Sequence, residues 1–599
     1  MTFQPHRRTV LRAIPAASLL LAGVGRVHAA ANDPWQRAAD IVARFATPLR
    51  FRDEDFLITA YGAKPCAMTE VQGQIASLVP GAIKTPAAGS PDCHPALSAA
   101  IAACHAKGGG RVVIPAGDWY CAGPMRLRSN VHVHLAAGAR LHFSANPAHY
   151  ARDGEHDCGA NGKLVQSRWQ GNDCLNFSPM VYALNETNIA LTGADWTSVL
   201  NGQGGVPFEG STECWWDWKG RAKNAGKRTE VAPNPANAPL EKIAPALDPA
   251  ARALIQGEGN KWQTDSRYLP ALSEAGVPLP RRVFGHGHFL RPCMIELIGC
   301  SKVLLQGYQV NGAPFWVHHP VACRDLLIRG VNMESLGPNS DGFDPEACDG
   351  VLVDQCTFNT GDDCIAIKSG KNRDTQFGPT RNIVIQRCVM NSGHGAITLG
   401  SEMAGGIEHI YAQQLELRNI HWKHDALNTA IRLKTNMNRG GFLRHLYVRD
   451  VVMPNGVATA PSWYKPLPGG AGPAQVASTA GAIITIDCDY APADDAVRTR
   501  PPQVSDIDIR NVRASNVDTG QGMYSCFQAF VLLGPVASSF NGASGTAIPP
   551  ITRVRIADCD FGTPRNAAQP WFLHNAAEVT LANVTIAGKR HDTVLSGKA

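Results

Sequence analysis

The sequence predicts an all-β fold, a right-handed parallel β-helix, with a helical cap before it and one long loop-rich insertion. Two observations predict this fold. A short apolar triplet, with a polar or small pair before it and a polar residue after it, recurs nine times in the 599-residue chain. Cysteines recur at fixed distances from several triplets. Such a recurring strand, with Asn and Gly at its corners, is typical of a solenoid whose coils stack about 4.8 Å apart.

The triplets define the predicted register. The first three start 23 and 25 residues apart, and the longer intervals that follow leave room for loops. Residues at the same distance from successive triplets should therefore be neighbours on adjacent coils. The triplets start at Val303, Leu326, Val351, Ile383, Ile410, Leu446, Ile507, Val554 and Val579.

The cysteines support this register. Three of them lie three residues before a triplet and three others lie five residues after one, namely Cys300, Cys323, Cys348, Cys356, Cys388 and Cys559. This recurrence fits inward-facing ladders of small side chains, because a free cysteine behaves as a small hydrophobe. The chain has 17 cysteines, so at least one is unpaired unless chains are cross-linked. The candidate loop disulfides are Cys66 with Cys93 or Cys104, and Cys158 with Cys174.

The amino-terminal residues predict an exported protein. Residues 1–29 combine a basic start, an apolar run from Ala13 to Val24 and small residues before a cleavage site, which is the pattern of a signal peptide. The Arg7-Arg8 pair favours the twin-arginine route over the general secretory route, although the full pattern is met only in part. We see no later stretch of sequence that is long and apolar enough to span a bilayer. We therefore expect a periplasmic or secreted protein.

The mature chain would be nearly neutral. Residues 1–29 contain four arginines and no acid, so their removal lowers the net charge from +6 to about +2. This balance gives no reason to expect nucleic-acid binding. An anionic partner would instead need a local cluster of cations.

Two helices should precede the coils. Residues 30–55 predict a helical extension in which Asp33 caps a helix that reaches about Ala46. After Phe56, an Ala-rich helix over Cys93–Lys107 leads into a strand over Arg111–Pro115. This second helix should cover the open end of the core, which would otherwise expose an unpaired edge. Residues 56–599 are then one elongated domain with an insertion at about 205–280.

Four polar clusters lie in order along the middle coils: Asn339-Ser340-Asp341, Gly361-Asp362-Asp363, Gly393-His394-Gly395 and Arg432-Leu433-Lys434. Asp362 lies 11 residues after Val351, and His394 lies 11 residues after Ile383, so the two side chains should be adjacent. Asp341 precedes them by one coil. Arg432 and Lys434 are two apart on a strand and so share a face. The register therefore predicts one site that holds three carboxylates, an imidazole and two cations.

These groups suit the hydrolysis of a glycosidic bond in an acidic sugar. The inverting reaction needs a protonated acid and a base about 6.5–9.5 Å apart, and we expect Asp341 and Asp362 to reach this separation on splayed side chains. Crowded carboxylates raise the pKa of at least one of them, which keeps an acid protonated. Arg432 and Lys434 would hold the carboxylate of the sugar.

The four clusters, in this order, resemble the signatures of glycoside hydrolase family 28, the polygalacturonase family: Asn-Thr-Asp, Gly-Asp-Asp, Gly-His-Gly and Arg-Ile-Lys. Ser340 and Leu433 are mild departures, and the run from Asn339 to Gly370 also matches. The resemblance extends from about Phe56 to the last coils. It implies a pectin-lyase-like solenoid with no cofactor and no metal.

The resemblance also implies residue roles. Asp362 would be the general acid, Asp341 and Asp363 would activate water, and His394 would be their hydrogen-bonding partner. Asn339, Arg432 and Lys434 would bind substrate.

The activity expected from this resemblance is inverting hydrolysis of α-1,4-galacturonosidic bonds in polygalacturonate or pectin. The partner would be an acidic polysaccharide or oligogalacturonide. The chain resembles the long bacterial exo-polygalacturonases, and the insertion at about 205–280 would close one end of the cleft. Its cluster of Trp215, Trp216 and Trp218 would either stack on sugars or, as such clusters more commonly do, anchor the insertion. A monomer is the default expectation.

Three alternatives stay open. A rhamnogalacturonan or xylogalacturonan hydrolase would share the family. A pectate lyase would share the β-helix but uses Ca²⁺ and an arginine base. A carbohydrate-binding or adhesive β-helix would have no activity. A second Gly-His-Gly, Gly285 to Gly287, precedes the first triplet and has no carboxylate pair one coil earlier, so we interpret it as a loop or cleft wall.

Overall fold

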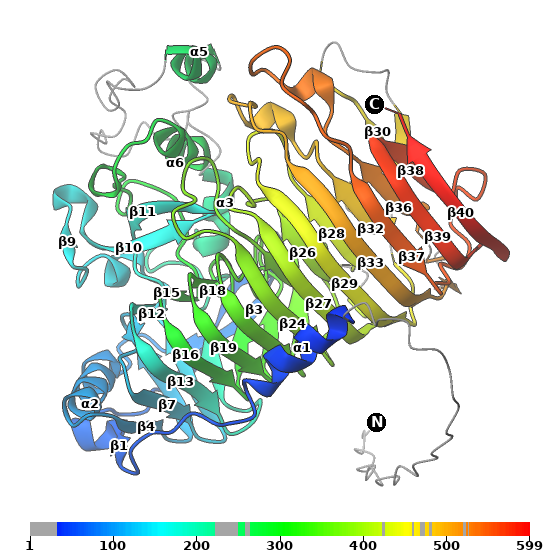
Figure 1. Cartoon of the computed structure of the whole chain (residues 1–599). Helices are drawn as coiled ribbons and strands as arrows, with labels where there is room; N and C mark the ends of the chain where they lie inside the picture. The colour runs from blue at the N-terminus through cyan, green and yellow to red at the C-terminus, as the bar shows by residue number, and fades with distance from the viewer. Residues whose placement is uncertain are drawn as a thin grey trace, which may run out of the picture.

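The computed structural model describes residues 33–221, 249–257, 264–421, 426–457, 461–467, 474–477, 482–518, 523–524 and 526–598. In these residues the chain winds into a parallel β-helix whose coils stack along one axis (Figure 1). The predicted all-β parallel solenoid is confirmed. The predicted signal peptide at residues 1–29 and much of the predicted insertion lie outside the described residues.

The coils place their strands on three faces. Face one consists of β1 (Asp55–Leu57), β4 (Gly110–Ile114), β7 (Val131–Leu135), β13 (Thr187–Gly193), β16 (Ser301–Gln306), β19 (Arg324–Arg329), β21 (Asp349–Asp354), β24 (Thr380–Gln386), β27 (Ile407–Leu417), β29 (Phe442–Met453), β33 (Gln503–Ala514), β37 (Thr552–Ala557) and β39 (Ala576–Ile586). The antiparallel strand β40 (Lys589–Gly597) ends it.

Faces two and three complete the coils. Face two consists of β5 (Gly117–Cys121), β8 (Ala139–Phe143), β14 (Val199–Asn201), β17 (Gln309–Asn311), β20 (Asn332–Ser335), β22 (Thr357–Thr360) and β25 (Val389–Met390). Face three consists of β6 (Met125–Arg126), β12 (Val181–Leu184), β15 (Ile295–Ile298), β18 (His318–Val321), β23 (Ile365–Ile367), β26 (Ile397–Gly400), β28 (Ile431–Lys434), β32 (Ala482–Asp487), β36 (Gln528–Leu533) and β38 (Trp571–His574). Single bridges through Phe343 and Glu346 join β18 to the later strands of face three.

The predicted register holds along the whole of face one. Val303 pairs with Leu326, which pairs with Val351, and each later triplet start pairs with the next as far as Val579. The solenoid also begins earlier than the triplets predict, because β13 pairs with both β7 and β16. The long segment between β14 and β15 separates these first coils from the rest in the sequence.

The ladder cysteines are buried, as predicted, and Cys323 Sγ donates to the carbonyl of Leu297 on the neighbouring coil at 3.2 Å. All 17 cysteines are free thiols, so the candidate disulfides are wrong. Cys158 packs against the main core, whereas Cys174 lies in a separate apolar cluster. Cys93 and Cys104 both face the core from the Ala-rich helix, while Cys66 is only half-buried outside it.

The Ala-rich helix α2 (His94–Ala106) covers the open end of the core, as predicted. Leu97, Ile101 and Cys104 are buried against Phe56 and the first strands of face one. The helix covers apolar side chains that would otherwise be exposed at this end of the core.

The helix of the predicted extension at residues 30–55 lies on a strand face and not at the end of the core. Helix α1 (Pro34–Ala43) begins as predicted, since Asp33 accepts from the amide of Trp35 at 3.0 Å, but ends before the expected Ala46. It lies across the outside of face one, where Ile41 packs near Leu352 and Val384 (Figure 1). The apolar outward residues of these strands explain why the extension lies on the sheet.

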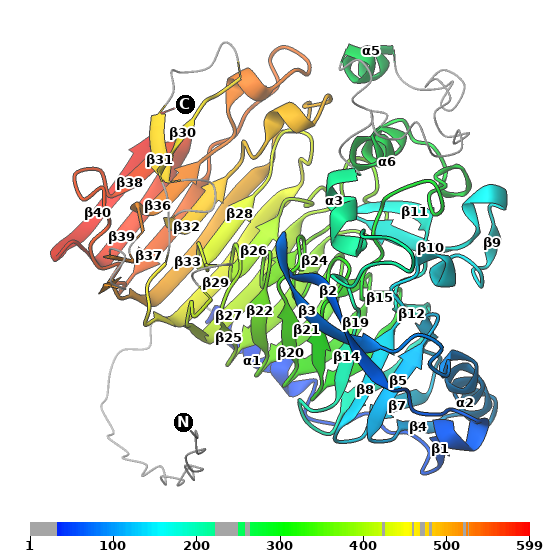
Figure 2. The same cartoon turned by 180° about the vertical axis from the view of Figure 1, so that it is seen from behind.

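Further elements decorate the coils. The hairpin of β2 (Met68–Ala76) and β3 (Val79–Pro86) crosses the strands in the view of Figure 2. The small sheet β9 (His156–Asp157), β10 (Lys163–Trp169) and β11 (Asn172–Asn176) lies near α3 (Trp218–Arg221), α5 (Pro249–Gly257) and α6 (Asp265–Glu274) in both views. The remaining elements are β30 (Pro461–Tyr464), β31 (Ala474–Ala477), β34 (Val517–Asp518), β35 (Met523–Tyr524), η1 (Ile58–Tyr61), η2 (Pro147–Tyr150), η3 (Gly159–Asn161), η4 (Trp215–Asp217), η8 (Leu279–Arg281), η9 (Pro492–Asp494) and η10 (Ala537–Ser539).

The tryptophan cluster anchors its segment. Trp215 is fully buried, and its ring meets those of Trp218, Phe177 and Phe208 edge-on. The Gly285 to Gly287 segment is a loop, with the amide of His286 donating to the carbonyl of Asn161 at 3.0 Å. Among the described residues no helix is long and apolar enough to cross a membrane.

Shortening a buried side chain of the helical cap should destabilise the whole solenoid. Leu97→Ala removes a fully buried side chain from the core beneath α2, which should cost about 2–5 kcal/mol of unfolding free energy. Urea denaturation followed by circular dichroism measures the loss. The matched control is Ser98→Ala, at an exposed position of the same helix, and equal effects of the two substitutions would contradict the role of the cap.

Candidate active site

The candidate site lies at the corner between faces two and three. Asp341 lies in the turn after β20, Asp362 and Asp363 in the turn between β22 and β23, and His394 in the turn between β25 and β26. Arg432 and Lys434 lie on β28, opposite Thr398 and Gly400 of β26. Successive coils therefore present the predicted residues at one place.

Close packing explains both glycines of the Gly393-His394-Gly395 cluster. A Cβ on Gly393 would lie 2.7 Å from the carbonyl of Asp362, and its φ of +127° is one that side chains rarely adopt. A Cβ on Gly395 would lie 2.3 Å from Oγ1 of Thr398. These positions let the His394 turn lie directly on the turn of the coil before it.

Asp362 and His394 are in contact, as the register predicts. Nδ1 of His394 lies 3.0 Å from Oδ1 of Asp362, and its amide donates to the Asp362 carbonyl at 3.1 Å. On the other side, Nδ2 of Asn339 donates to Oδ2 of Asp362 at 3.3 Å, and Arg291 donates to Asn339 at 2.7 Å. Both Asp362 oxygens are therefore oriented by neighbouring turns.

The two cations pair with the deepest carboxylate. Nζ of Lys434 lies 2.6 Å from Oδ2 of Asp363, and Nη1 of Arg432 lies 3.2 Å from its Oδ1. Asp363 is fully buried, whereas Lys434 and Arg432 reach the pocket surface. Tyr490 lies over both cations, 5.7–5.8 Å from ring centroid to charge. The cations neutralise Asp363, which lies beneath the pocket, and themselves line the pocket.

Asp341 sits in a second charged group that the sequence analysis missed. Nζ of Lys368 lies 3.9 Å from Asp341, 3.3 Å from Asp344 and 3.3 Å from Glu402. It also lies 4.3 Å from the centroid of the Trp316 ring. Asp344 and Lys368 fall inside the run from Asn339 to Gly370, but a lone acid and a lone lysine there carry no spacing signal.

Charge separates the pKa values of the carboxylates. Burial, together with the charges of Asp344 and Asp362, raises the pKa of Asp341 well above its usual range. Burial also raises the pKa of Asp344, to about 8. Burial opposes ionisation of Asp362 too, yet His394, Lys434 and Arg432 outweigh it and hold its pKa well below the usual range. Of the three aspartates assigned catalytic roles, Asp341 is therefore the one whose pKa is raised.

The three carboxylates lie close together. Asp341, Asp362 and Asp363 each place one oxygen within 4.8 Å of the others. The Asp341 to Asp362 separation expected from splayed side chains stays a prediction.

The same oxygens have the geometry of a metal site, but the neighbouring charges disfavour it. Lys434 and Arg432 already contact Asp363, and His394 contacts Asp362. A second buried group, Cys293, Glu296 and His319, uses both ring nitrogens of the histidine on carboxylates, at 3.0 Å and 2.9 Å. Protein cations or hydrogen bonds therefore already occupy Asp362 and Asp363 in the first group and the histidine in the second, and they compete with a metal ion for these ligands.

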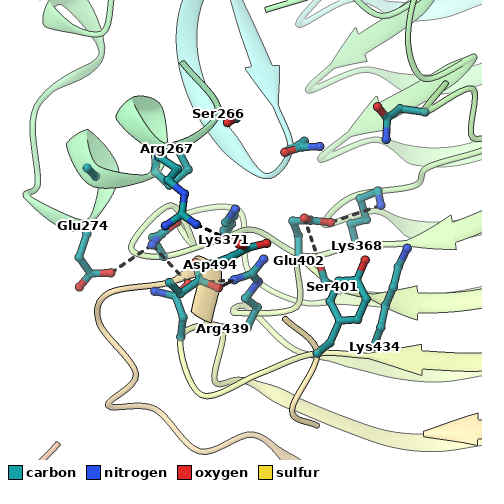
Figure 3. Close-up of a pocket in the computed structure, with 18 of the residues that line it drawn as sticks. Ser266, Arg267, Glu274, Lys368, Lys371, Ser401, Glu402, Lys434, Arg439 and Asp494 are labelled. Carbon is teal, nitrogen blue, oxygen red and sulfur yellow. Dashed lines mark hydrogen bonds and ion pairs between the residues drawn. The ribbon is translucent and has the colours of Figure 1, made fainter. Parts of the chain in front are cut away.

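The site opens into a pocket of about 670 Å³. Six of the seven predicted residues line it, and Asp363 lies beneath. Opposite them, α6 forms a wall whose Arg267 pairs with Asp494 at 2.9 Å (Figure 3). Glu274 of the same helix pairs with Arg500 at 2.7 Å. Ion pairs thus hold the helix against the loops of later coils.

Comparisons with known proteins agree with this site. Residues 287–460, which contain all seven predicted residues, match the model of glycosyl hydrolases family 28. A probable polygalacturonase of Vitis vinifera is 35% identical over 170 residues, which cover 28% of this chain and 33% of that protein. A probable exopolygalacturonase B of Aspergillus flavus is 24% identical over 178 residues, or 28% and 36% of the two chains.

The matched part is thus about a third of the length of these curated relatives. The crystal structure of a hyperthermoactive exopolygalacturonase from Thermotoga maritima aligns with 94% of this chain and 98% of its own, with a TM-score of 0.65 and 24% identity. That likeness supports the fold. The predicted resemblance to the family is confirmed.

Loss of the imidazole should change stability in a pH-dependent way. The charge of Asp362 raises the pKa of His394, so the pairing contributes fully below the unfolded pKa of about 6.5 and fades as pH rises through the folded pKa. His394→Asn should therefore lower the urea midpoint more at about pH 5.5 than at about pH 9. The control is His156→Asn, at an exposed position. An equal loss at both pH values would contradict the ion pair.

Proposed function

We propose that this protein is a glycoside hydrolase that cleaves α-1,4-galacturonosidic bonds of polygalacturonate or pectin from a chain end. One observation carries the proposal: three carboxylates within 4.8 Å of one another lie beside Arg432 and Lys434 in a pocket. The carboxylates supply an acid and a base, and the cations can hold a sugar carboxylate.

In the proposed reaction Asp362 donates a proton to the glycosidic oxygen, which leaves with the bonding electrons. Asp341 and Asp363 orient a water molecule, and its oxygen bonds to the anomeric carbon as its proton passes to the ionised member of this pair. Attack from the face opposite the leaving group inverts the configuration. The inversion is proposed from the family signatures.

The proton on Asp362 requires a change on binding. In the free protein the charges of His394, Lys434 and Arg432 keep Asp362 ionised. A galacturonate carboxylate bound at Lys434 and Arg432 would offset two of these charges and exclude water, and both effects raise the pKa of Asp362. Binding of the substrate would then raise the pKa of Asp362 enough for it to act as the general acid. The rival assignment, with Asp341 as the acid, rests on its raised pKa.

Exo action is proposed from the wall of the pocket. Helix α6 stands opposite the catalytic residues, and the pairs Arg267–Asp494 and Glu274–Arg500 hold it there. A polymer could not pass such a wall and would enter with one end. The predicted insertion therefore contributes the closing element, although residues 222–248 and 258–263 lie outside the described part.

The remaining expectations stay proposals. Residues 1–29 would direct export to the periplasm or beyond and be removed, and the mature chain would act as a monomer on an acidic polysaccharide. Residues 56–599 would form the catalytic domain.

The first test concerns the acid. Asp362→Asn should lower kcat on polygalacturonate by about 100-fold to 10,000-fold, because it removes the proton donor. A nitrophenyl α-galacturonide has a leaving group that needs no proton, so the variant should retain most of its activity on that substrate. The matched control is Asp341→Asn, which should lose activity on both substrates. Rescue of Asp341→Asn and not of Asp362→Asn by the activated substrate would exchange the two roles.

The second test concerns the products. Polygalacturonate should yield only mono- or digalacturonate from the start, and NMR should show the first product as the β-anomer if the reaction inverts. Absorbance from unsaturated ends would indicate a lyase, and faster cleavage of rhamnogalacturonan would favour the other family members. The double variant Arg267→Ala, Glu274→Ala should add longer oligomers by loosening the wall. A ladder of mixed oligomers from the unmodified protein would refute exo action.

A further inference from the structure

One cation in the pocket makes no ion pair within the described residues. The side chain of Lys371 is 7% exposed, lines the pocket and lies four residues after the end of β23. Its backbone is held in place, since its amide donates to the carbonyl of Gly171 at 3.0 Å and its carbonyl accepts from Asn172 at 2.8 Å. Lys371 is therefore a buried and positioned ammonium group whose open side is the pocket.

The carboxylates nearest to Lys371 already have partners. Glu402 pairs with Lys368 at 3.3 Å and accepts from Ser401 at 2.9 Å. Asp495 pairs with Arg439. Burial and the charge of Arg439 lower the pKa of Lys371 to about 8. A buried ammonium without a paired carboxylate is costly, and a ligand carboxylate removes that cost.

Arg439 adds a second positive group at the same place. Its Nη1 contacts Asp495, whereas its buried Nε has no hydrogen-bond partner among the described residues. In Figure 3 Lys371 and Arg439 lie on the α6 side of Glu402, and Lys368 and Lys434 lie on its other side. The pocket thus has two separate cationic groups, and the one near α6 is unassigned by the proposed reaction.

We propose that Lys371, supported by Arg439, binds the carboxylate of the sugar that occupies the closed, α6 side of the pocket. The inference rests on the proposed function, in which each sugar of the substrate carries one carboxylate. Arg432 and Lys434 then hold the acid group on one side of the cleaved bond, and Lys371 holds the acid group on the other. The terminal sugar must be a free acid, because a methyl ester offers no charge to Lys371.

Calorimetry on the inactive Asp362→Asn protein tests whether Lys371 binds the carboxylate of the terminal sugar. The two ligands are trigalacturonate and the same trimer methyl-esterified only at its terminal, non-reducing sugar. The free acid should bind roughly 10- to 100-fold more tightly than the ester, as expected for a charge-assisted hydrogen bond. Adding Lys371→Met should weaken binding of the free acid by the same factor and abolish the discrimination. Adding Lys371→Arg should preserve most of the affinity for the free acid and most of the discrimination against the ester. Lys589→Met, at an exposed position on β40, is the matched control.

The outcomes separate the two proposals. Discrimination against the ester that persists with Lys371→Met, in a protein with unchanged thermal melting, overturns the assignment of Lys371. Equal binding of acid and ester in the parent protein overturns it as well, while the proposed function stands. Binding of neither trimer overturns both.

Discussion

The in-register stacking of parallel strands is the constraint on which the rest of the structure depends. Because each coil pairs residue for residue with the next, as Val351 does with Ile383, any two residues at equal offsets become neighbours. Asp362 and His394 meet for this reason, although they are 32 residues apart. A slip of one residue would turn the inward side chains outward and separate the site.

Stacked carboxylates on adjacent coils need neighbouring cations. Carboxylates on adjacent coils would repel one another, and in the described residues cations from neighbouring coils stand against them. Lys434 and Arg432 neutralise Asp363, and Lys368 stands between Asp341, Asp344 and Glu402. The result is an uneven division of protons, with Asp341 favouring the acid form and Asp362 the ionised form. This division makes the state of the site sensitive to an anionic ligand.

The solenoid supplies the floor of the site, and the decorations supply its walls. Helix α6 comes from the irregular segment between β14 and β15, and its ion pairs with Asp494 and Arg500 connect it to loops more than two hundred residues later. Trp215 and its aromatic neighbours fix the beginning of that segment in the core. The repeating coils thus place the charged residues of the site, and the segment between β14 and β15 forms a wall of the pocket.

Sequence by itself determined the strand register and the meeting of the predicted site residues at one place. A triplet that recurs nine times is a local pattern, and the ordered clusters from Asn339 to Lys434 take their relative positions from it. The alanine-rich cap was equally readable, since its buried residues face one side. Tertiary structure alone decided that the cysteines stay unpaired, where α1 lies on the sheet, and that Asp344, Lys368 and Lys371 lie beside the predicted site residues. These depend on side chains from distant segments meeting in a low-dielectric interior, where contact and burial set the charge of each group, and no spacing along the chain encodes such contacts.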